Sequence, residues 1–168
     1  MYSQIHILAQ QAADALRARR WLLTTAESCT GGGIAVALTD IAGSSQWFES
    51  GFVTYSNQAK QDMLGVRHET LMKHGAVSEA TVAEMVAGAL ARSNAQLAVA
   101  VSGIAGPAGG TPGKPVGMVC LAWQAEGMMP VVRTEYFSGD RAAVRAEAVK
   151  HALRGVLELC NEGTESED

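Results

Sequence analysis

The spacing of apolar positions predicts long helices near both ends of the chain. Between Ile5 and Leu16, apolar side chains recur every three or four residues, and this amphipathic segment runs into the arginine-rich residues 17–20. A second helical pattern extends from about Asp140 to Cys160. Its expected inner face consists of Val149, Leu153, Val156, Leu157 and Cys160. We therefore expect two amphipathic helices that pack on a common core.

Short apolar and β-favouring runs between these helices predict five strands. They span residues 21–26, 48–55, 97–101, 116–123 and 131–137. The last two are joined near Gly127, which indicates a hairpin, whereas helical segments separate the others. This alternation predicts an α/β fold, a single layered domain in which helices flank a mixed β-sheet.

The connecting helices carry recognisable start signals. A small-residue turn at 27–33 leads into the apolar run 34–38, which predicts a strand-turn-helix unit. Ser56 is a suitable N-cap for a short helix that contains Lys60 and stops near Gly65. Ser78 is a suitable N-cap for a further helix. The apolar face expected for that helix is Val82, Met85, Val86, Ala89 and Leu90.

Length and charge limit the domain count and the partners. A chain of 168 residues with 48% hydrophobic and 18% charged residues is typical of one globular domain, which we place at residues 1–161. The acidic segment 162–168 holds four of the 17 acidic residues and is expected to be a disordered tail. The body is then neutral and lacks a basic, aromatic-rich patch. We therefore expect no nucleic-acid partner.

Cysteine usage and the N-terminal sequence indicate a cytoplasmic protein. The 3 cysteines are widely spaced and form no C-x-x-C pair, which argues against a disulfide framework and against a structural zinc site. The N-terminal residues have no signal-peptide layout, and no apolar run is long enough to span a membrane. We expect a reducing compartment and no membrane partner.

Two small-residue loops follow buried strands, where ligands bind in open α/β sheets. In the first loop Ser28 and Thr30 precede three glycines that allow a ligand to approach the backbone, and a helix cap and a binding site are equally compatible with this pattern. The loop is neither a Walker loop, since no lysine follows the glycines, nor a dinucleotide fingerprint, since Val36 occupies the last glycine position. The second loop, 103–110, is either a long flexible turn or a ligand-facing one.

A nucleophilic serine needs a base, and Lys60 is one candidate. The four histidines are scattered, and none has a carboxylate at a spacing that indicates a catalytic pair. A lysine acts as a base only if burial or a neighbouring charge lowers its pKa. From the sequence alone, a solvated helix residue is the simpler interpretation of Lys60. Arg141 and Arg145 lie one turn apart at a helix start, where cations are disfavoured. Either Asp140 or an anionic ligand such as a phosphate would offset that cost.

Five motifs in this order resemble the CinA C-terminal domain family, in particular its stand-alone nicotinamide-nucleotide amidohydrolases of the PncC type. The resemblance extends over about residues 5–158. The motifs are Ala26-Glu27-Ser28-Cys29-Thr30-Gly31-Gly32, Tyr55-Ser56-Asn57-Gln58-Ala59-Lys60, Gly75-Ala76-Val77-Ser78-Glu79, Ser102-Gly103-Ile104-Ala105-Gly106-Pro107 and Gly139-Asp140-Arg141. It implies hydrolysis of the carboxamide of nicotinamide mononucleotide (NMN) to nicotinic acid mononucleotide and ammonia.

The resemblance also implies roles for individual residues. Ser28 matches the nucleophile, Lys60 the base and Tyr55 the tyrosine beside them. The expected oxyanion and substrate-binding residues are Cys29, Thr30, Gly31, Ser102, Gly106, Arg141 and Arg145. No metal and no organic cofactor is expected, since amide hydrolysis needs only a nucleophile, a base and an oxyanion hole. We expect a homodimer, which is the commonest assembly for a small enzyme.

Two other functions remain open at this point. A binding module that senses a pyridine nucleotide or another phosphorylated ligand would use the same loop and arginines without turnover. A competence or DNA-damage role, suggested by the family name, finds no support in the neutral body.

Overall fold

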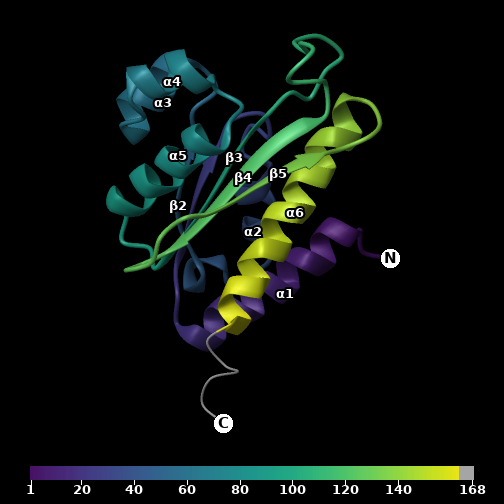
Figure 1. The fold of residues 1–168 in the computed structure, drawn as a ribbon. Coiled ribbons are helices and arrows are strands. Elements are labelled where there is room, and N and C mark those ends of the chain that lie inside the picture. The colour runs from purple at the N-terminus through teal and green to yellow at the C-terminus, as the bar shows by residue number, and fades with distance from the viewer. Residues whose placement is uncertain (163–168) are drawn as a thin grey trace.

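The computed structural model describes residues 1–162 and consists of a five-stranded sheet between two layers of helices (Figure 1). In chain order the elements are α1 (Gln4–Arg19), β1 (Leu23–Glu27), α2 (Gly33–Thr39), the 3₁₀ helix η1 (Ser44–Gln46), β2 (Phe48–Val53), α3 (Asn57–Leu64), α4 (His68–His74), α5 (Glu79–Ala91), β3 (Leu97–Gly103), β4 (Met118–Ala125), β5 (Val131–Tyr136) and α6 (Arg141–Glu162). No helix in this range is long and apolar enough to cross a membrane.

The sheet is mixed, as the sequence predicts. Its strand order is β2-β1-β3-β4-β5, with β1 parallel to both β2 and β3, and with β4 antiparallel to β3 and to β5. In this register Glu27, the last residue of β1, lies opposite Val53 of β2 and Val101 of β3. The carboxyl ends of three neighbouring parallel strands therefore meet at one edge of the sheet, where ligands bind in folds of this type.

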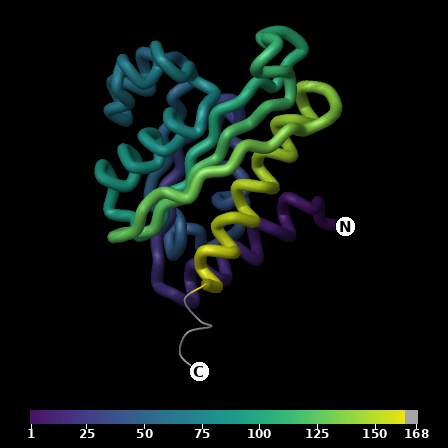
Figure 2. Tube along the Cα trace, viewed as in Figure 1, coloured from purple at the N-terminus to yellow at the C-terminus, as the bar shows by residue number. Residues whose placement is uncertain are grey.

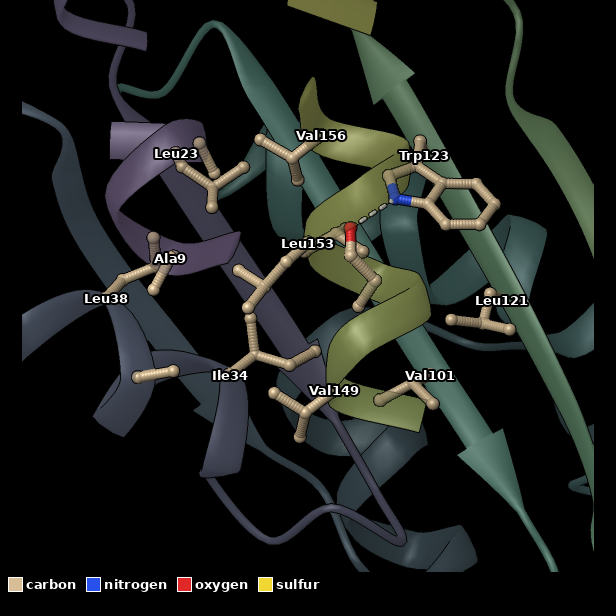
Figure 3. Close-up of a cluster of buried hydrophobic side chains, with 14 of the residues drawn as sticks. Ala9, Leu23, Ile34, Leu38, Val101, Leu121, Trp123, Val149, Leu153 and Val156 are labelled. Atoms are coloured by element: carbon tan, nitrogen blue, oxygen red, sulfur yellow. Dashed lines mark hydrogen bonds between the residues drawn. The ribbon is translucent and has the colours of Figure 1, made fainter. Parts of the chain in front are cut away.

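Each face of the sheet is covered by its own helices. Helices α1 and α6 lie side by side on one face, whereas α3, α4 and α5 lie on the other (Figure 2). The larger core joins α1, α2 and α6 to alternate residues of the strands. Figure 3 shows Trp123 of β4 against α6, where its indole N–H donates a hydrogen bond to the Ala152 carbonyl at 3.0 Å. Burial of apolar side chains on both faces holds the sheet edge in place.

The expected helix caps are present. The Ser56 side chain accepts the N–H of Ala59 at 3.0 Å, and the Ser78 side chain accepts the N–H of Thr81 at 3.1 Å. Gly65 ends α3 with a φ of 70°, a left-handed conformation that glycine adopts without strain. Local capping signals thus place α3, and with it Lys60, directly after β2.

Some predicted boundaries are wrong. The first strand begins at Leu23 rather than residue 21, and β3 continues two residues further, to Gly103. Helix α4 was not predicted, because its seven residues are mostly polar and show no apolar period. Leu157 is only half-buried and lies outside the core assigned to α6. Helix α6 includes Glu162, and the rest of the acidic segment, 163–168, lies outside the described residues.

We expect Gly155→Ala to destabilise the fold. A Cβ at Gly155 would lie 2.1 Å from Cε2 of Trp123, so α6 must move away from β4. Overpacking of this kind costs about 1–3 kcal/mol, which lowers the Tm of a domain of this size by roughly 2–12 °C. Thermal unfolding followed by circular dichroism measures the shift. Gly113→Ala is the matched control, because no atom lies within 4 Å of its added Cβ. Equal Tm values for the two variants would contradict the prediction.

Candidate active site

Ser28 lies in a tight turn directly after β1, at the carboxyl edge of the sheet. Its N–H donates to the Val101 carbonyl at 3.0 Å, which extends the pairing of β1 and β3 by one residue. The turn is closed by a bond from the N–H of Gly31 to the Ser28 carbonyl, also 3.0 Å long. Gly31 and Gly32 have φ values of 59° and 100°, which glycine adopts more readily than any other residue.

The Ser28 hydroxyl does not cap α2. The N-cap position of α2 is Gly32, which offers no side-chain acceptor. The hydroxyl of Ser28 instead lies 3.0 Å from the amine nitrogen of Lys60. Of the two interpretations that the sequence allows for this hydroxyl, the geometry favours the site over the cap.

Lys60 is the largest fully buried side chain in the described chain, with an exposed fraction of 1%. Its Nζ donates to the carbonyls of Thr54 and Tyr55 at 2.9 and 3.2 Å. Burial lowers the pKa of the Lys60 amine below its ordinary value, because a charged ammonium loses hydration there. The solvated helix residue that the isolated sequence suggested is therefore not what the fold contains.

The partners of Lys60 determine which hydrogen-bonding position of its amine is left for Ser28. The carbonyls of Thr54 and Tyr55 can only accept hydrogen bonds, and a neutral amine has two N–H donors and one lone pair. When both donors are used by the carbonyls, the lone pair is left for the third neighbour, the hydroxyl of Ser28. The neutral amine is thus oriented to accept the Ser28 proton.

Glu27 is a buried member of the site to which the sequence analysis gave no role. Its side chain has an exposed fraction of 0%, and its carboxylate accepts the Thr30 hydroxyl at 2.6 Å and the N–H groups of Ile34 and Ala35 at 2.9 and 3.1 Å. The available signal was an acidic residue at the end of a strand whose other residues are apolar or hydroxyl-bearing. The Glu27 side chain points to the α2 side of the sheet, opposite to Ser28.

Cys29 follows Ser28 but is not suited to be a nucleophile. Its side chain is 5% exposed, and burial raises the pKa of its thiol to about 11. Only the thiolate is strongly nucleophilic. Within residues 1–162, the backbone N–H groups of Cys29 and Thr30 donate no hydrogen bond to another residue.

Arg141 joins three segments at the mouth of the site. Its guanidinium donates to the Gly106 carbonyl at 2.9 Å and to the Tyr55 hydroxyl at 3.1 Å, so the second small-residue loop does reach the site. The Tyr55 side chain is 60% exposed, and Tyr55 contacts the Lys60 amine through its backbone carbonyl. Two of the five N–H donors of Arg141 are used, which leaves three for a ligand.

Arg145 of α6 supports the turn that carries Ser28. It donates to the carbonyls of Cys29 and Thr30 at 3.1 and 3.3 Å. Asp140 accepts the N–H of Ala143 at 2.9 Å and thus caps α6. The unfavourable placement of two arginines at a helix start is offset by this cap and by four hydrogen bonds, three of them to backbone carbonyls.

Ser102 lies beside the turn but is the least connected of the predicted site residues. It follows Val101, is 1% exposed and pairs with Cys120 of β4. Its side chain shares the sheet face of Ala98 and Ala100, the face that α5 covers. The remaining predicted residues form two hydrogen-bonded groups, which the chain itself joins between Ser28 and Cys29. One group is Ser28, Gly31, Tyr55, Lys60, Gly106 and Arg141, and the other is Cys29, Thr30 and Arg145. Among residues 1–162, no group of three or more His, Cys, Asp or Glu side chains is placed to hold a metal ion.

Comparisons with known proteins identify the family. The family model of the CinA C-terminal domain matches residues 5–160. The chain is 56% identical to the nicotinamide-nucleotide amidohydrolase PncC of Escherichia coli K12, over 90% of this chain and 92% of that protein. It is 52% identical to the protein of the same name from Pseudomonas putida, with 96% and 98% covered. A CinA-like protein of Chloroherpeton thalassium is 49% identical, but the match covers only 37% of its length.

Solved structures agree with this assignment. A competence/damage inducible protein from Agrobacterium tumefaciens has a TM-score of 0.91 at 47% identity, with 96% of this chain and 98% of that chain covered. A CinA superfamily protein from Klebsiella pneumoniae has a TM-score of 0.90 at 46% identity, with 94% and 98% covered. The chain belongs to the CinA C-terminal domain family.

Proposed function

We propose that this protein hydrolyses the carboxamide of NMN to nicotinic acid mononucleotide and ammonia. The activity is the one named for its relatives from E. coli and P. putida, which it matches over almost its whole length. The observation that carries the chemistry is the 3.0 Å contact between the Ser28 hydroxyl and the buried amine of Lys60. This pair supplies a nucleophile and a base with a lowered pKa.

In the first half-reaction, neutral Lys60 takes the proton of the Ser28 hydroxyl while the Ser28 oxygen attacks the carboxamide carbon. The carbon–nitrogen bond of the tetrahedral intermediate then breaks. The Lys60 ammonium returns its proton to the leaving nitrogen, which departs as ammonia, and an ester of Ser28 remains.

In the second half-reaction, water takes the place of the Ser28 hydroxyl. Lys60 accepts a proton from the water as its oxygen attacks the ester carbon. The ester bond breaks, Ser28 recovers its proton from Lys60, and the carboxylic acid is released. The Thr54 and Tyr55 carbonyls orient the amine in both half-reactions, since both accept hydrogen bonds from it.

The N–H groups of Cys29 and Thr30 would stabilise the negative charge that develops on the carboxamide oxygen. They lie directly after Ser28 in a turn that Gly31 closes, and they have no acceptor in another residue of the described chain. Donors that are already fixed in place cost no reorganisation during the reaction.

Arg141 is the better of the two arginines to bind the 5′-phosphate. It lies at the mouth of the site, where it bonds the Tyr55 hydroxyl and the Gly106 carbonyl, whereas both bonds of Arg145 go to carbonyls of the turn that carries Ser28. A guanidinium can bind a phosphate through two parallel hydrogen bonds. This contact would select the nucleotide over free nicotinamide. Ser102 and Gly106 would complete the substrate-facing wall.

We also retain the proposals of a cytoplasmic homodimer without a metal or an organic cofactor. Cys29, Cys120 and Cys160 are free and buried, which fits a reducing compartment. Large apolar side chains are exposed near the site, on Val36 of α2 and on Val53 and Tyr55 at the end of β2. Such side chains are suited to an interface with a second copy.

We expect ammonia release from NMN by the purified protein, and its loss in Ser28→Ala and Lys60→Ala. Removal of either partner should lower kcat by at least about 1,000-fold, because nucleophile and base act as a unit. Lys73→Ala, at an exposed position of α4, is the control and should retain wild-type activity. EDTA should have no effect. A wild-type protein that binds NMN but releases no ammonia would instead be a binding module.

The dependence of kcat/KM on pH should show an acidic limb. The rate rises as Lys60 loses its proton, and since burial lowers the pKa of this amine, the midpoint should lie below the value of about 10.4 for a free lysine. Steady-state assays with buffers of constant ionic strength measure the profile. A pH-independent kcat/KM at acidic and neutral pH would mean that Lys60 is not the titrating base.

Arg141→Ala should raise the KM for NMN by about 10-fold or more, because a charge-assisted hydrogen bond contributes about 1.5–3 kcal/mol. Arg154→Ala, on the same helix away from the site, is the control and should leave KM unchanged. Competition by free nicotinamide should be unaffected by Arg141→Ala. If kcat falls while KM is unaltered, Arg141 does not bind the phosphate.

A further inference from the structure

Glu27 is the fully buried acidic residue next to the nucleophile, and the chemistry proposed above does not use it. With an exposed fraction of 0%, its carboxylate cannot reach solvent or substrate. A buried carboxylate is costly unless hydrogen bonds satisfy it. Its three donors are the Thr30 hydroxyl and the N–H groups of Ile34 and Ala35. All three belong to the segment that follows Ser28.

These contacts connect the end of β1 to the start of α2. The N-cap Gly32 provides no side chain, so the first free N–H groups of α2 find their acceptor in Glu27. A negative charge is also favoured at this end of a helix. The Glu27 carboxylate thereby binds Thr30 before the three glycines 31–33 and binds the backbone of Ile34 and Ala35 after them.

Thr30 is the residue on which the contacts of the turn converge. Its hydroxyl donates to Glu27 at 2.6 Å, and its carbonyl accepts the Gly33 N–H at 3.0 Å and the Arg145 guanidinium at 3.3 Å. Arg145 also holds the Cys29 carbonyl at 3.1 Å. The peptide groups around Thr30 are therefore held by two groups, the Glu27 carboxylate through the Thr30 hydroxyl and the Arg145 guanidinium through the Cys29 and Thr30 carbonyls.

We propose that Glu27 is a positioning residue for the reaction: through the Thr30 hydroxyl it fixes the peptide plane that carries the oxyanion-binding N–H groups next to Ser28. This inference rests on the proposed function and assigns Glu27 no contact with substrate. Because the carboxylate acts on the orientation of the turn, it influences the transition state more than the binding of the ground state.

The test compares kcat and KM for NMN in Thr30→Val, Thr30→Ser and Glu27→Gln. Thr30→Val removes the donor with little change in shape, and kcat should fall at least about tenfold while KM stays within about twofold. Thr30→Ser keeps the donor and should recover kcat relative to Thr30→Val. Glu27→Gln replaces one acceptor oxygen by a donor and should lower kcat as much or more. The double variant Glu27→Gln/Thr30→Val should lose no more kcat than Glu27→Gln alone, because both substitutions break the same contact between residues 27 and 30.

Thr25→Val is the matched control. Thr25 lies on the same strand, is equally buried and has a hydroxyl without a hydrogen-bond partner among the described residues, so its replacement should leave kcat and KM unchanged. The Tm of each variant is measured alongside. If Glu27→Gln does not fold, Thr30→Val still tests the same contact with a smaller change.

A second readout does not depend on NMN. Phenylmethylsulfonyl fluoride sulfonylates a nucleophilic serine: the Ser28 oxygen bonds to sulfur, fluoride leaves, and the proton passes to Lys60. Glu27→Gln and Thr30→Val should slow this labelling as they slow turnover.

If the wild type releases ammonia and both variants keep its kcat and its labelling rate, the positioning role alone is overturned. If the wild type releases no ammonia but its Ser28 is labelled, and the labelling is slower in both variants, only the proposed function is overturned. Neither turnover nor labelling in wild type would overturn both.

Discussion

The desolvated amine of Lys60 is the feature on which the site depends. A lysine at this depth could be a liability, since its charged form is poorly solvated. The Thr54 and Tyr55 carbonyls satisfy two of its hydrogen-bonding positions and leave the third for Ser28. Because these carbonyls belong to the backbone, they cannot rotate away as side chains can. Burial keeps the amine neutral at lower pH, and the two backbone carbonyls leave its lone pair for the Ser28 hydroxyl.

The sheet topology supplies this arrangement. Ser28 follows β1 and the Thr54 carbonyl follows the neighbouring parallel strand β2, so both arrive at the same edge. The Ser56 cap then starts α3 at once, and Lys60 returns along this helix toward the strand ends. On the opposite face, Glu27 and Arg145 hold the turn that carries Ser28. The geometry of the candidate site is thus built from the ends of regular elements rather than from a flexible loop, which favours precise placement of the side chains.

Much of this arrangement could be predicted from the sequence, for identifiable reasons. Ser56, Ser78 and Gly65 are local signals, so the ends of α3 and the start of α5 followed from short-range chemistry. The strands followed from apolar runs, although β3 extends to Gly103 because cross-strand pairing continues past the last apolar residue.

Lys60 and Ser28 lie 32 residues apart, and their contact depends on burial that no local pattern encodes. The contacts of Glu27 were missed because its acceptor role depends on how α2 packs against β1. Helix α4 was missed because its polar residues carry no apolar period.

The two arginines of α6 join segments that lie far apart in the sequence. Arg145 reaches back 116 residues to the Cys29 carbonyl, and Arg141 reaches back 86 residues to the Tyr55 hydroxyl. A ribosome-bound chain that ends before α6 already contains Ser28 and Lys60 but lacks both contacts. Contacts of such high sequence separation form late, after the intervening chain has been ordered. The Ser28 turn therefore gains its two bonds from Arg145 only after α6 has packed against the sheet, so the site is assembled from the ends of the fold inward.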